Sequence, residues 1–118
     1  MTRKSTAELF EELATQPERT HLEVLNEESM TVEVGRYKTG TSEPKNPHTG
    51  DEIYYVIEGA GMARAGDETY EVEAGDVMYV ESGLEHDFFN IDEELKVLIV
   101  LAGKEEPGAY TMREETDE

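Results

Sequence analysis

Apolar and polar residues alternate along most of the chain between residues 30 and 102. Within short runs an apolar residue recurs at every second position, and glycine, proline, aspartate and asparagine separate the runs. This period of two is typical of β-strands with one buried face. The pattern predicts seven short strands, at residues 30–37, 52–58, 61–65, 69–73, 76–80, 86–91 and 95–102, with a weaker one at 20–25.

No helical pattern interrupts the seven runs. They therefore predict an all-β domain of antiparallel sheets, either a sandwich or a barrel. Gly66 and Asp67 separate two of the runs and fit the tight turn of a hairpin.

A helical pattern occurs once, at residues 5–14. Ser5 is suited to cap the amino end of a helix, and Glu8 follows three positions later. Leu9, Phe10 and Leu13 then form one apolar stripe. We expect a short N-terminal helix that lies over the edge or the mouth of the β-structure.

Length and composition indicate a single domain, because 118 residues suffice for one core. We divide the chain into a helix with its lead-in (1–16), a β-domain (17–104) and a charged tail (105–118) that we expect to be mobile. The chain has no cysteine, which excludes disulfides, zinc–thiolate sites, iron–sulfur clusters and cysteine nucleophiles.

Two of the predicted strands, at 53–57 and 97–101, are apolar on both faces. One face of such a strand can line the interior, but the other needs cover. The short helix supplies part of that cover. We expect a second subunit, in a homodimer, to supply the rest, and cover from within the chain is the alternative.

The chain is strongly acidic, with 29 Asp and Glu against 10 Lys and Arg and a formal net charge of -19. Such a surface repels phosphate backbones and anionic lipids, so we expect no nucleic acid and no membrane as partners. Without an apolar signal region or a membrane-spanning run, a soluble cytoplasmic protein is expected. The acidity also suggests a halophile, whose salt screens the self-repulsion. A partly disordered acidic protein is the alternative, and the regular apolar runs argue against it.

The candidate chemistry lies with the histidines, of which the chain has three: His21, His48 and His86. His48 and Glu52 stand four residues apart, so in an extended chain their side chains point to the same face. Two imidazoles and a carboxylate from two strands form a ligand set that leaves open positions on a divalent ion. On spacing alone, coincidence in an acidic chain is the simpler explanation.

The spacing of these residues resembles the two motifs of the cupin family. The first motif has a glycine, H-x-H, a glutamate and a glycine; the second has a glycine, P-x-G, a histidine and an asparagine. The matching positions are Gly40, Asn46, His48, Glu52 and Gly59 for the first motif, and Gly75, Glu81, Gly83, His86 and Asn90 for the second. Both spacings fit over 51 consecutive residues.

The resemblance implies a small single-domain cupin, a double-sheet jelly-roll barrel that holds one divalent metal ion. The ligands of the family map onto His48, Glu52 and His86. Asn46 replaces the first histidine of H-x-H, and Glu81 replaces the proline. Asn46 could offer its amide oxygen to the metal or stay out of contact, and both alternatives leave three ligands. We favour iron or manganese, with zinc and nickel as the alternatives.

An open three-ligand face predicts a metal-dependent enzyme for a small organic substrate, with dioxygenase chemistry as the first choice. Isomerase, lyase and decarboxylase activities are alternatives, because a fold does not determine a reaction. A second hypothesis is a non-catalytic module that binds a small ligand or a metal. A third is a structural barrel without ligand, which would bury His48, Glu52 and His86 at a cost in desolvation.

Further residues have expected places. Tyr54 shares the face of Glu52 and is the candidate catalytic side chain; the alternative, which we favour, is a core tyrosine whose hydroxyl reaches a neighbour. His86, Phe88 and Asn90 share a face if the chain is extended, with Asn90 satisfying backbone groups. His21 is expected at the surface or at an edge. The predicted apolar lining comprises Val56, Met62, Met78 and Phe88.

Overall fold

The computed structural model describes residues 3–41 and 50–103 of the chain. This part folds into one helix and six strands, all paired in antiparallel fashion. The elements are α1 (Thr6–Ala14), β1 (His21–Asn26), β2 (Met30–Tyr37), β3 (Glu52–Ala65), β4 (Glu68–Glu73), β5 (Val77–Val80) and β6 (His86–Ala102). The predicted all-β fold with a short N-terminal helix is confirmed.

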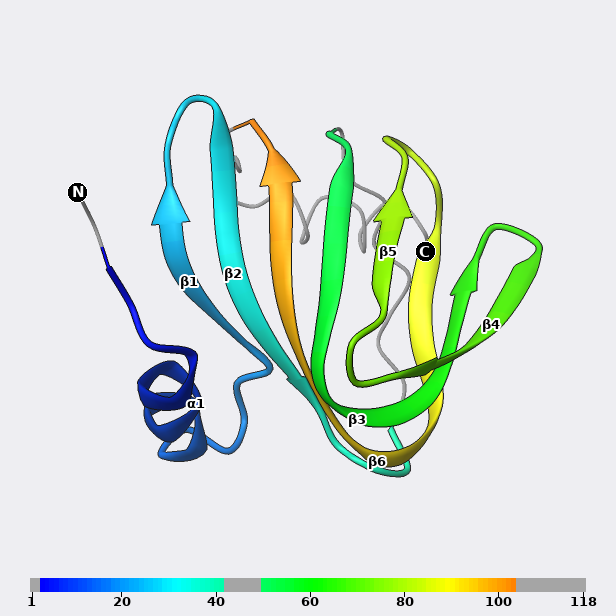
Figure 1. The fold of residues 1–118 in the computed structure, drawn as a ribbon, viewed down its shortest axis with the longest axis horizontal. Coiled ribbons are helices and arrows are strands. Elements are labelled where there is room, and N and C mark those ends of the chain that lie inside the picture. The colour runs from blue at the N-terminus through cyan, green and yellow to red at the C-terminus, as the bar shows by residue number, and fades with distance from the viewer. Residues whose placement is uncertain (1–2, 42–49, 104–118) are drawn as a thin grey trace.

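The strands form one strongly curved sheet in the order β1-β2-β6-β3-β4, and β5 also pairs with β3 (Figure 1). β3 and β6 are long, and each belongs to both halves of the curve. The first half of β3 lies between β5 and the last half of β6, whereas its second half lies between β4 and the first half of β6. Two sheets therefore face each other across a core, as in the expected jelly roll.

The number of strands differs from the prediction at two places. Residues 52–58 and 61–65 belong to one strand, β3, and residues 86–91 and 95–102 belong to one strand, β6. The prediction of separate strands is wrong because the chain bends without leaving the ladder. Gly59 (φ 99°) marks the bend in β3, and the pairing register shifts around it. A Cβ at this position would run into the carbonyl oxygen of Glu94, so only glycine fits.

The bend in β3 changes which side chains face the interior. Before the bend the even positions Tyr54 and Val56 are buried, but after it the odd position Ala63 is buried. Met62 is only partly buried, and its ladder neighbours are Glu71 and Phe89. The prediction that Met62 lines the interior is therefore wrong, because the register shift reverses the alternation.

β6 bends in a similar way at Asn90. This residue is in the left-handed conformation (φ 45°), which asparagine tolerates better than most residues. His86 and Phe88 are buried, but Asn90 is exposed and Ile91 is buried in its place. The prediction that Asn90 shares the face of His86 and Phe88 is wrong, because the left-handed residue interrupts the alternation.

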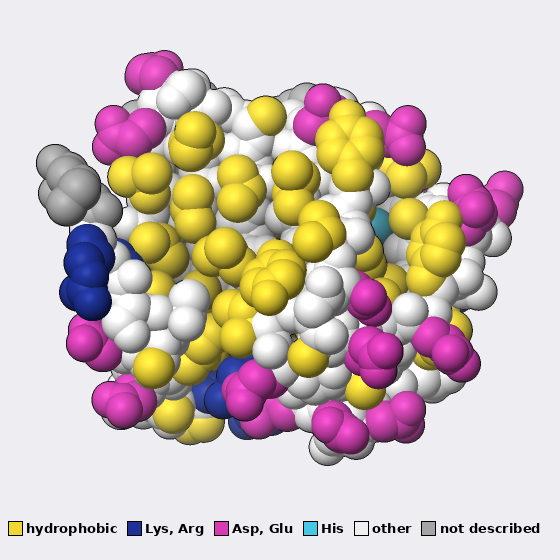
Figure 2. Space-filling view, viewed as in Figure 1, with side chains coloured by type: hydrophobic (Ala, Val, Ile, Leu, Met, Phe, Trp, Pro, Cys, Tyr) yellow, Lys and Arg dark blue, Asp and Glu magenta, His cyan; other side chains and the backbone are white. Residues whose placement is uncertain are grey.

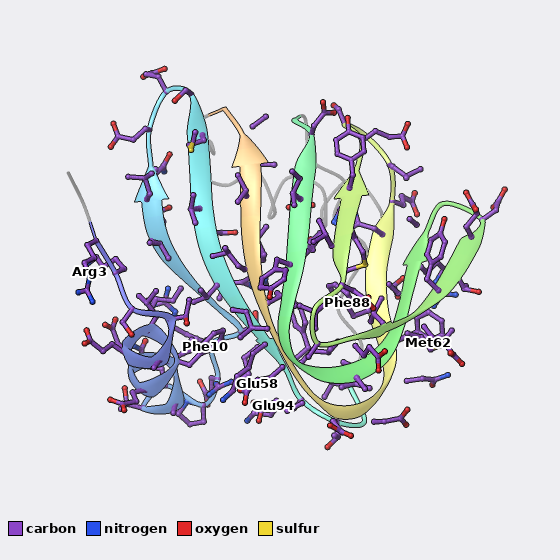
Figure 3. All side chains as sticks on the ribbon, in the orientation of Figure 1. Arg3, Phe10, Glu58, Met62, Phe88 and Glu94 are labelled. Atoms are coloured by element: carbon purple, nitrogen blue, oxygen red, sulfur yellow. The ribbon has the colours of Figure 1, made fainter. Side chains whose placement is uncertain are left out.

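α1 covers part of the outer face of the sheet. The Ser5 Oγ caps the helix by accepting a hydrogen bond from the Glu8 N–H at 3.5 Å. The apolar stripe of the helix is buried as predicted, and Phe10 points towards the sheet (Figure 3). The cluster between helix and sheet contains Leu9, Phe10, Leu13, Leu22 and Val34, with Val24, Ile57 and Leu98 packed against it. The second, larger cluster fills the interior between the two halves of the sheet.

The β3–β4 connection is the predicted hairpin, in which Ala65 pairs with Glu68 across Gly66 and Asp67. Among the described residues, the only helix is too short to cross a membrane. The predicted mobile tail at 105–118 lies outside the described residues.

Candidate functional site in the barrel interior

Three of the predicted site residues meet inside the curved sheet. Glu52 and Tyr54 lie at the start of β3, and His86 is the first residue of β6. His86 pairs in the ladder with Ala65, at the far end of β3, and not with Glu52. The side chains of Glu52 and His86 therefore come together across the interior, because both long strands fold over. All three residues are buried, and Glu52 is only 2% exposed.

The hydrogen bonds around His86 define the chemistry of its ring. Nδ1 lies 2.9 Å from the carbonyl oxygen of Leu84, which can only accept, so Nδ1 carries a proton. In the neutral ring Nε2 then has a lone pair. Nε2 lies 2.9 Å from the Glu52 Oε1 and 3.0 Å from the Tyr54 hydroxyl. A carboxylate and an imidazole lone pair at this distance need a proton or a cation between them.

The surroundings of His86 favour its protonated form. Burial by itself would lower the pKa of His86, but three neighbours outweigh it. The Glu52 carboxylate and the Leu84 carbonyl oxygen bond to the ring, and the negative charges of Glu52 and Asp87 add to their effect, so the net pKa of His86 is raised. The same negative field that holds a proton on Nε2 also favours a cation at that point.

A cavity of about 390 Å³ opens beside these residues. Its wall includes the buried Tyr54, His86 and Phe88, and its outer part is formed by side chains of β4 and β5. In the space-filling view a histidine is visible in the hollow between the yellow patches over β5 and β4 (Figure 2). Of the predicted apolar lining, Met78 and Phe88 line the cavity, while Val56 is buried in the core behind it.

Aromatic rings hold Tyr54 in place. Its ring packs edge-on against Phe88, with 5.3 Å between the ring centroids, and Phe88 stacks on Tyr37 at 5.1 Å. The Tyr37 hydroxyl lies 2.9 Å from the Nε2 of His21. His21 is thus half-buried on the edge strand β1, as the prediction of an edge position requires, and it contacts the Tyr37 ring that stacks on Phe88.

The donor atoms at the centre of the site suit a divalent metal. A metal-bound histidine commonly donates its second ring N–H to a backbone carbonyl, as His86 does to Leu84. The carboxylate of Glu52 faces the other ring nitrogen of His86. The predicted ligands His48 and Asn46 lie outside the described residues. Within the described residues no group of three acidic, histidine or cysteine side chains is assembled.

Two features close to the site have no counterpart in the predictions. Arg64 forms a two-point ion pair with Asp87, at 3.0 and 3.4 Å, in the wall of the cavity next to His86. Glu33 is buried on β2 in the same ladder row as Ile99 and Tyr54, so it faces the interior. A signal for Glu33 exists in the sequence, because it has the same parity as the buried Tyr37 in an apolar strand.

The fold and the site together define a small antiparallel β-barrel with a histidine–carboxylate pair at the bottom of a cavity. Residues 29–102 match the family described as "Cupin domain". The chain is 38% identical to the uncharacterized protein SCO3923 of Streptomyces coelicolor over 85 residues, 72% of this chain and 81% of that protein. The chain therefore belongs to the cupin family.

Solved structures support the same fold. KdgF from Halomonas sp. superposes with a TM-score of 0.67 at 16% identity, over 73% of this chain and 79% of that one. The DMSP lyase DddQ from Ruegeria pomeroyi superposes with a TM-score of 0.68 at 21% identity, over 76% of this chain and 50% of that one. At such identities the likeness concerns the fold alone.

Proposed function

We propose that the protein is a metal-dependent enzyme that acts on a small organic substrate in the barrel interior. The observation that supports this most is the buried contact between the Glu52 carboxylate and the His86 Nε2, with Nδ1 already bonded to a carbonyl oxygen. In this arrangement His86 and Glu52 would hold a divalent ion together with His48, and Asn46 would either add its amide oxygen or stay out of contact. Iron or manganese is favoured, and zinc and nickel are the alternatives.

The bound ion would supply Lewis-acid or redox chemistry, and a dioxygenase reaction is our first choice. The described residues have separate tasks. The Leu84 carbonyl oxygen fixes the tautomer and the orientation of His86. Phe88 and Met78 keep water away from the reacting part of the substrate. The Tyr54 hydroxyl stands 3.0 Å from His86 and is placed to hydrogen-bond a substrate oxygen.

Elemental analysis by mass spectrometry of untagged protein tests the proposal. We expect about one equivalent of iron or manganese per chain in the wild type and loss of the metal in His86→Ala. His21→Ala is the matched control, because it removes a histidine outside the cavity and should leave the metal content unchanged. A wild type that stays without metal after reconstitution would exclude the metalloenzyme. If metal is present, an oxygen-consumption screen of small organic acids and diphenols follows.

A non-catalytic binding module is the second candidate, and one observation favours it. Tyr54, His86 and Glu52 already form a contiguous hydrogen-bonded cluster, so the interior is polar and satisfied with a proton alone. The variant Asn46→His distinguishes the two candidates. It should tighten metal binding in both cases, but it can change a turnover rate only in an enzyme. DddQ carries lyase in its name, and lyase chemistry therefore belongs in the same screen as oxidation.

The salt-rich habitat also remains our proposal. It rests on the net charge of -19, which salt would screen. Unfolding by urea at increasing potassium chloride tests it: we expect the midpoint to rise with salt, and an unchanged midpoint would argue against it.

A further inference from the structure

The cavity beside His86 has a floor of small side chains. Two rows of inward-facing residues run from β6 across β3 to β4, which lie side by side (Figure 1). One row contains His86, Ala65 and Glu68, and the other contains Phe88, Ala63 and Tyr70. Residues paired across a ladder point to the same face, so β3 contributes only alanines between the larger side chains of its two neighbours. All six residues line the cavity of about 390 Å³.

The spacing of the strands sets the size of a molecule that fits on this floor. Neighbouring strands lie about 4.8 Å apart, so the backbones of β6 and β4 are separated by roughly 10 Å across β3. Side chains from both walls occupy part of this distance, and the rest suits a molecule about as wide as one ring. A small organic molecule that contacts His86 on one wall therefore also contacts Glu68 and Tyr70 on the other.

The β4 wall presents hydrogen-bond acceptors to such a molecule. The Tyr70 hydroxyl is bonded to the Glu68 carboxylate, and this bond is the main reason why the pKa of Tyr70 is raised. The hydroxyl keeps its proton and donates it to Glu68, because a carboxylate can only accept. The lone pairs that remain, on the phenol oxygen and on the carboxylate, are available to a ligand. A ligand group at this wall has to donate hydrogen bonds, and the negative charge of Glu68 favours a cation.

A group that could bind an anion is not available at this wall in the described part of the chain. Arg64 is the only Lys or Arg among the described residues that line the cavity. Its Nε and Nη2 lie 3.0 and 3.4 Å from the Asp87 carboxylate, and its guanidinium lies 4.3 Å from the centre of the Phe89 ring. The ladder pair Arg64–Asp87 alternates with the two alanine rows, so both side chains leave the sheet on its other face. An anionic group beside Glu68 would therefore be repelled without compensation.

We propose that the cavity binds a small organic molecule that carries a positively charged amine, and that Glu68 selects this amine. The amine lies against the Glu68 carboxylate and the Tyr70 oxygen, and the oxygen-bearing end of the same molecule lies at His86. Placement of the oxygen end rests on the proposed function, in which a metal ion is bound there. Recognition of the amine needs no metal, because Glu68 and Tyr70 lie on the opposite wall, across the alanine floor.

Three small diphenols that share one diol and differ in charge test the selection. Catechol is neutral, dopamine adds an ammonium group and protocatechuate adds a carboxylate. Titration calorimetry without oxygen measures their dissociation constants, first with metal-free protein and then with protein loaded with Mn²⁺. Potassium chloride at about 0.5 M reduces the screening length to about 4 Å, so the net charge of -19 contributes little to the preference.

We expect metal-free wild type to bind dopamine about ten-fold more tightly than protocatechuate, because a charge-assisted hydrogen bond replaces a repulsion. Glu68→Gln should reduce this ratio to about two-fold or less, and Glu68→Lys should invert it. Glu73→Gln is the matched control, because it removes the same charge from an exposed position on the same strand, outside the cavity lining, and should keep the ratio. Circular dichroism confirms that each variant is folded.

The outcomes separate the amine from the metal. A ratio near one in the wild type, a ratio that Glu68→Gln leaves unchanged, or no binding of dopamine in either state would overturn the proposal. An equal decrease in Glu73→Gln would also overturn it, since the overall charge would then be the cause. Protein that takes up no Mn²⁺ but prefers dopamine through Glu68 supports amine selection and refutes the metalloenzyme. Protein that takes up Mn²⁺ and binds the three diphenols equally does the reverse.

Discussion

Replacing Tyr54 with phenylalanine separates the role of its hydroxyl from that of its ring. The hydroxyl lies 3.0 Å from the His86 Nε2, which is also the ring atom that a metal ion would use. A metal ion would therefore have to replace the hydrogen bond between Nε2 and the Tyr54 hydroxyl, whichever of the two atoms carries the proton. The variant Tyr54→Phe keeps the packing of the ring against Phe88 and removes only this hydrogen bond. We expect the metal-free protein to become less stable and the metal to bind more tightly.

The size of both effects follows from the burial of this bond. Tyr54 is 6% exposed, so its hydroxyl has little access to water once the partner is lost. A typical buried hydrogen bond contributes about 1 kcal/mol net. The metal-free variant should lose about this much stability, a decrease of roughly 4 °C in Tm. Metal binding no longer has to break the bond, so affinity should rise by roughly five-fold, the equivalent of about 1 kcal/mol.

Titration calorimetry with Mn²⁺ in the presence of a competing chelator measures the affinity, and urea unfolding in excess chelator measures the stability. Tyr70→Phe is the matched control, because the Tyr70 hydroxyl is bonded to the exposed Glu68 at the outer part of the cavity and should change neither quantity. Weaker metal binding in Tyr54→Phe would refute the reasoning and show that the hydroxyl supports the metal. An unchanged stability would show that the hydroxyl contributes nothing to the metal-free site.

Three further predictions concern the bends and the histidine. Gly59→Ala should cost about 3 kcal/mol of stability or prevent folding, because the new Cβ meets the Glu94 carbonyl oxygen. Gly75→Ala is the control: Gly75 has the same φ of 99° and nothing within 4 Å of the new Cβ, so only about 1 kcal/mol of backbone strain is expected. Urea unfolding measures both costs, and equal costs would contradict the clash at Gly59. Asn90→Val should lose about 1–2 kcal/mol at its positive φ and Asn90→Gly should lose little, as compared by thermal unfolding. In metal-free protein the raised pKa of His86 stabilises the fold fully below a pH of about 6.5, and this contribution is lost as pH rises through the folded pKa. Urea unfolding midpoints of the wild type and of His86→Gln, measured at several pH values, show that loss. The midpoint of the wild type relative to that of His86→Gln should fall as pH rises, and a relative midpoint that rises with pH would contradict the raised pKa.

The family and the general position of the site were predictable from the sequence because they depend on local spacing. Alternation around Glu52 and Tyr54 correctly placed both side chains on one buried face, and the capping residue and apolar stripe correctly predicted α1. The alternation failed beyond Gly59 and Asn90. A bend reverses the parity of every later residue, and spacing does not reveal on which residue a bend falls.

Contacts between distant segments were decided only by the tertiary structure. Glu52 and His86 are far apart in the sequence and are not ladder neighbours, and they meet because β3 and β6 both fold over. The protonated Nδ1 of His86 likewise depends on the carbonyl oxygen that the preceding turn presents to it. The sequence alone determined which residues face inwards along each uninterrupted strand, since that depends on a period of two. The tertiary structure decided which of these inward-facing residues are in contact. The bends in the long strands β3 and β6 bring donors and acceptors from opposite walls of the barrel within hydrogen-bond distance.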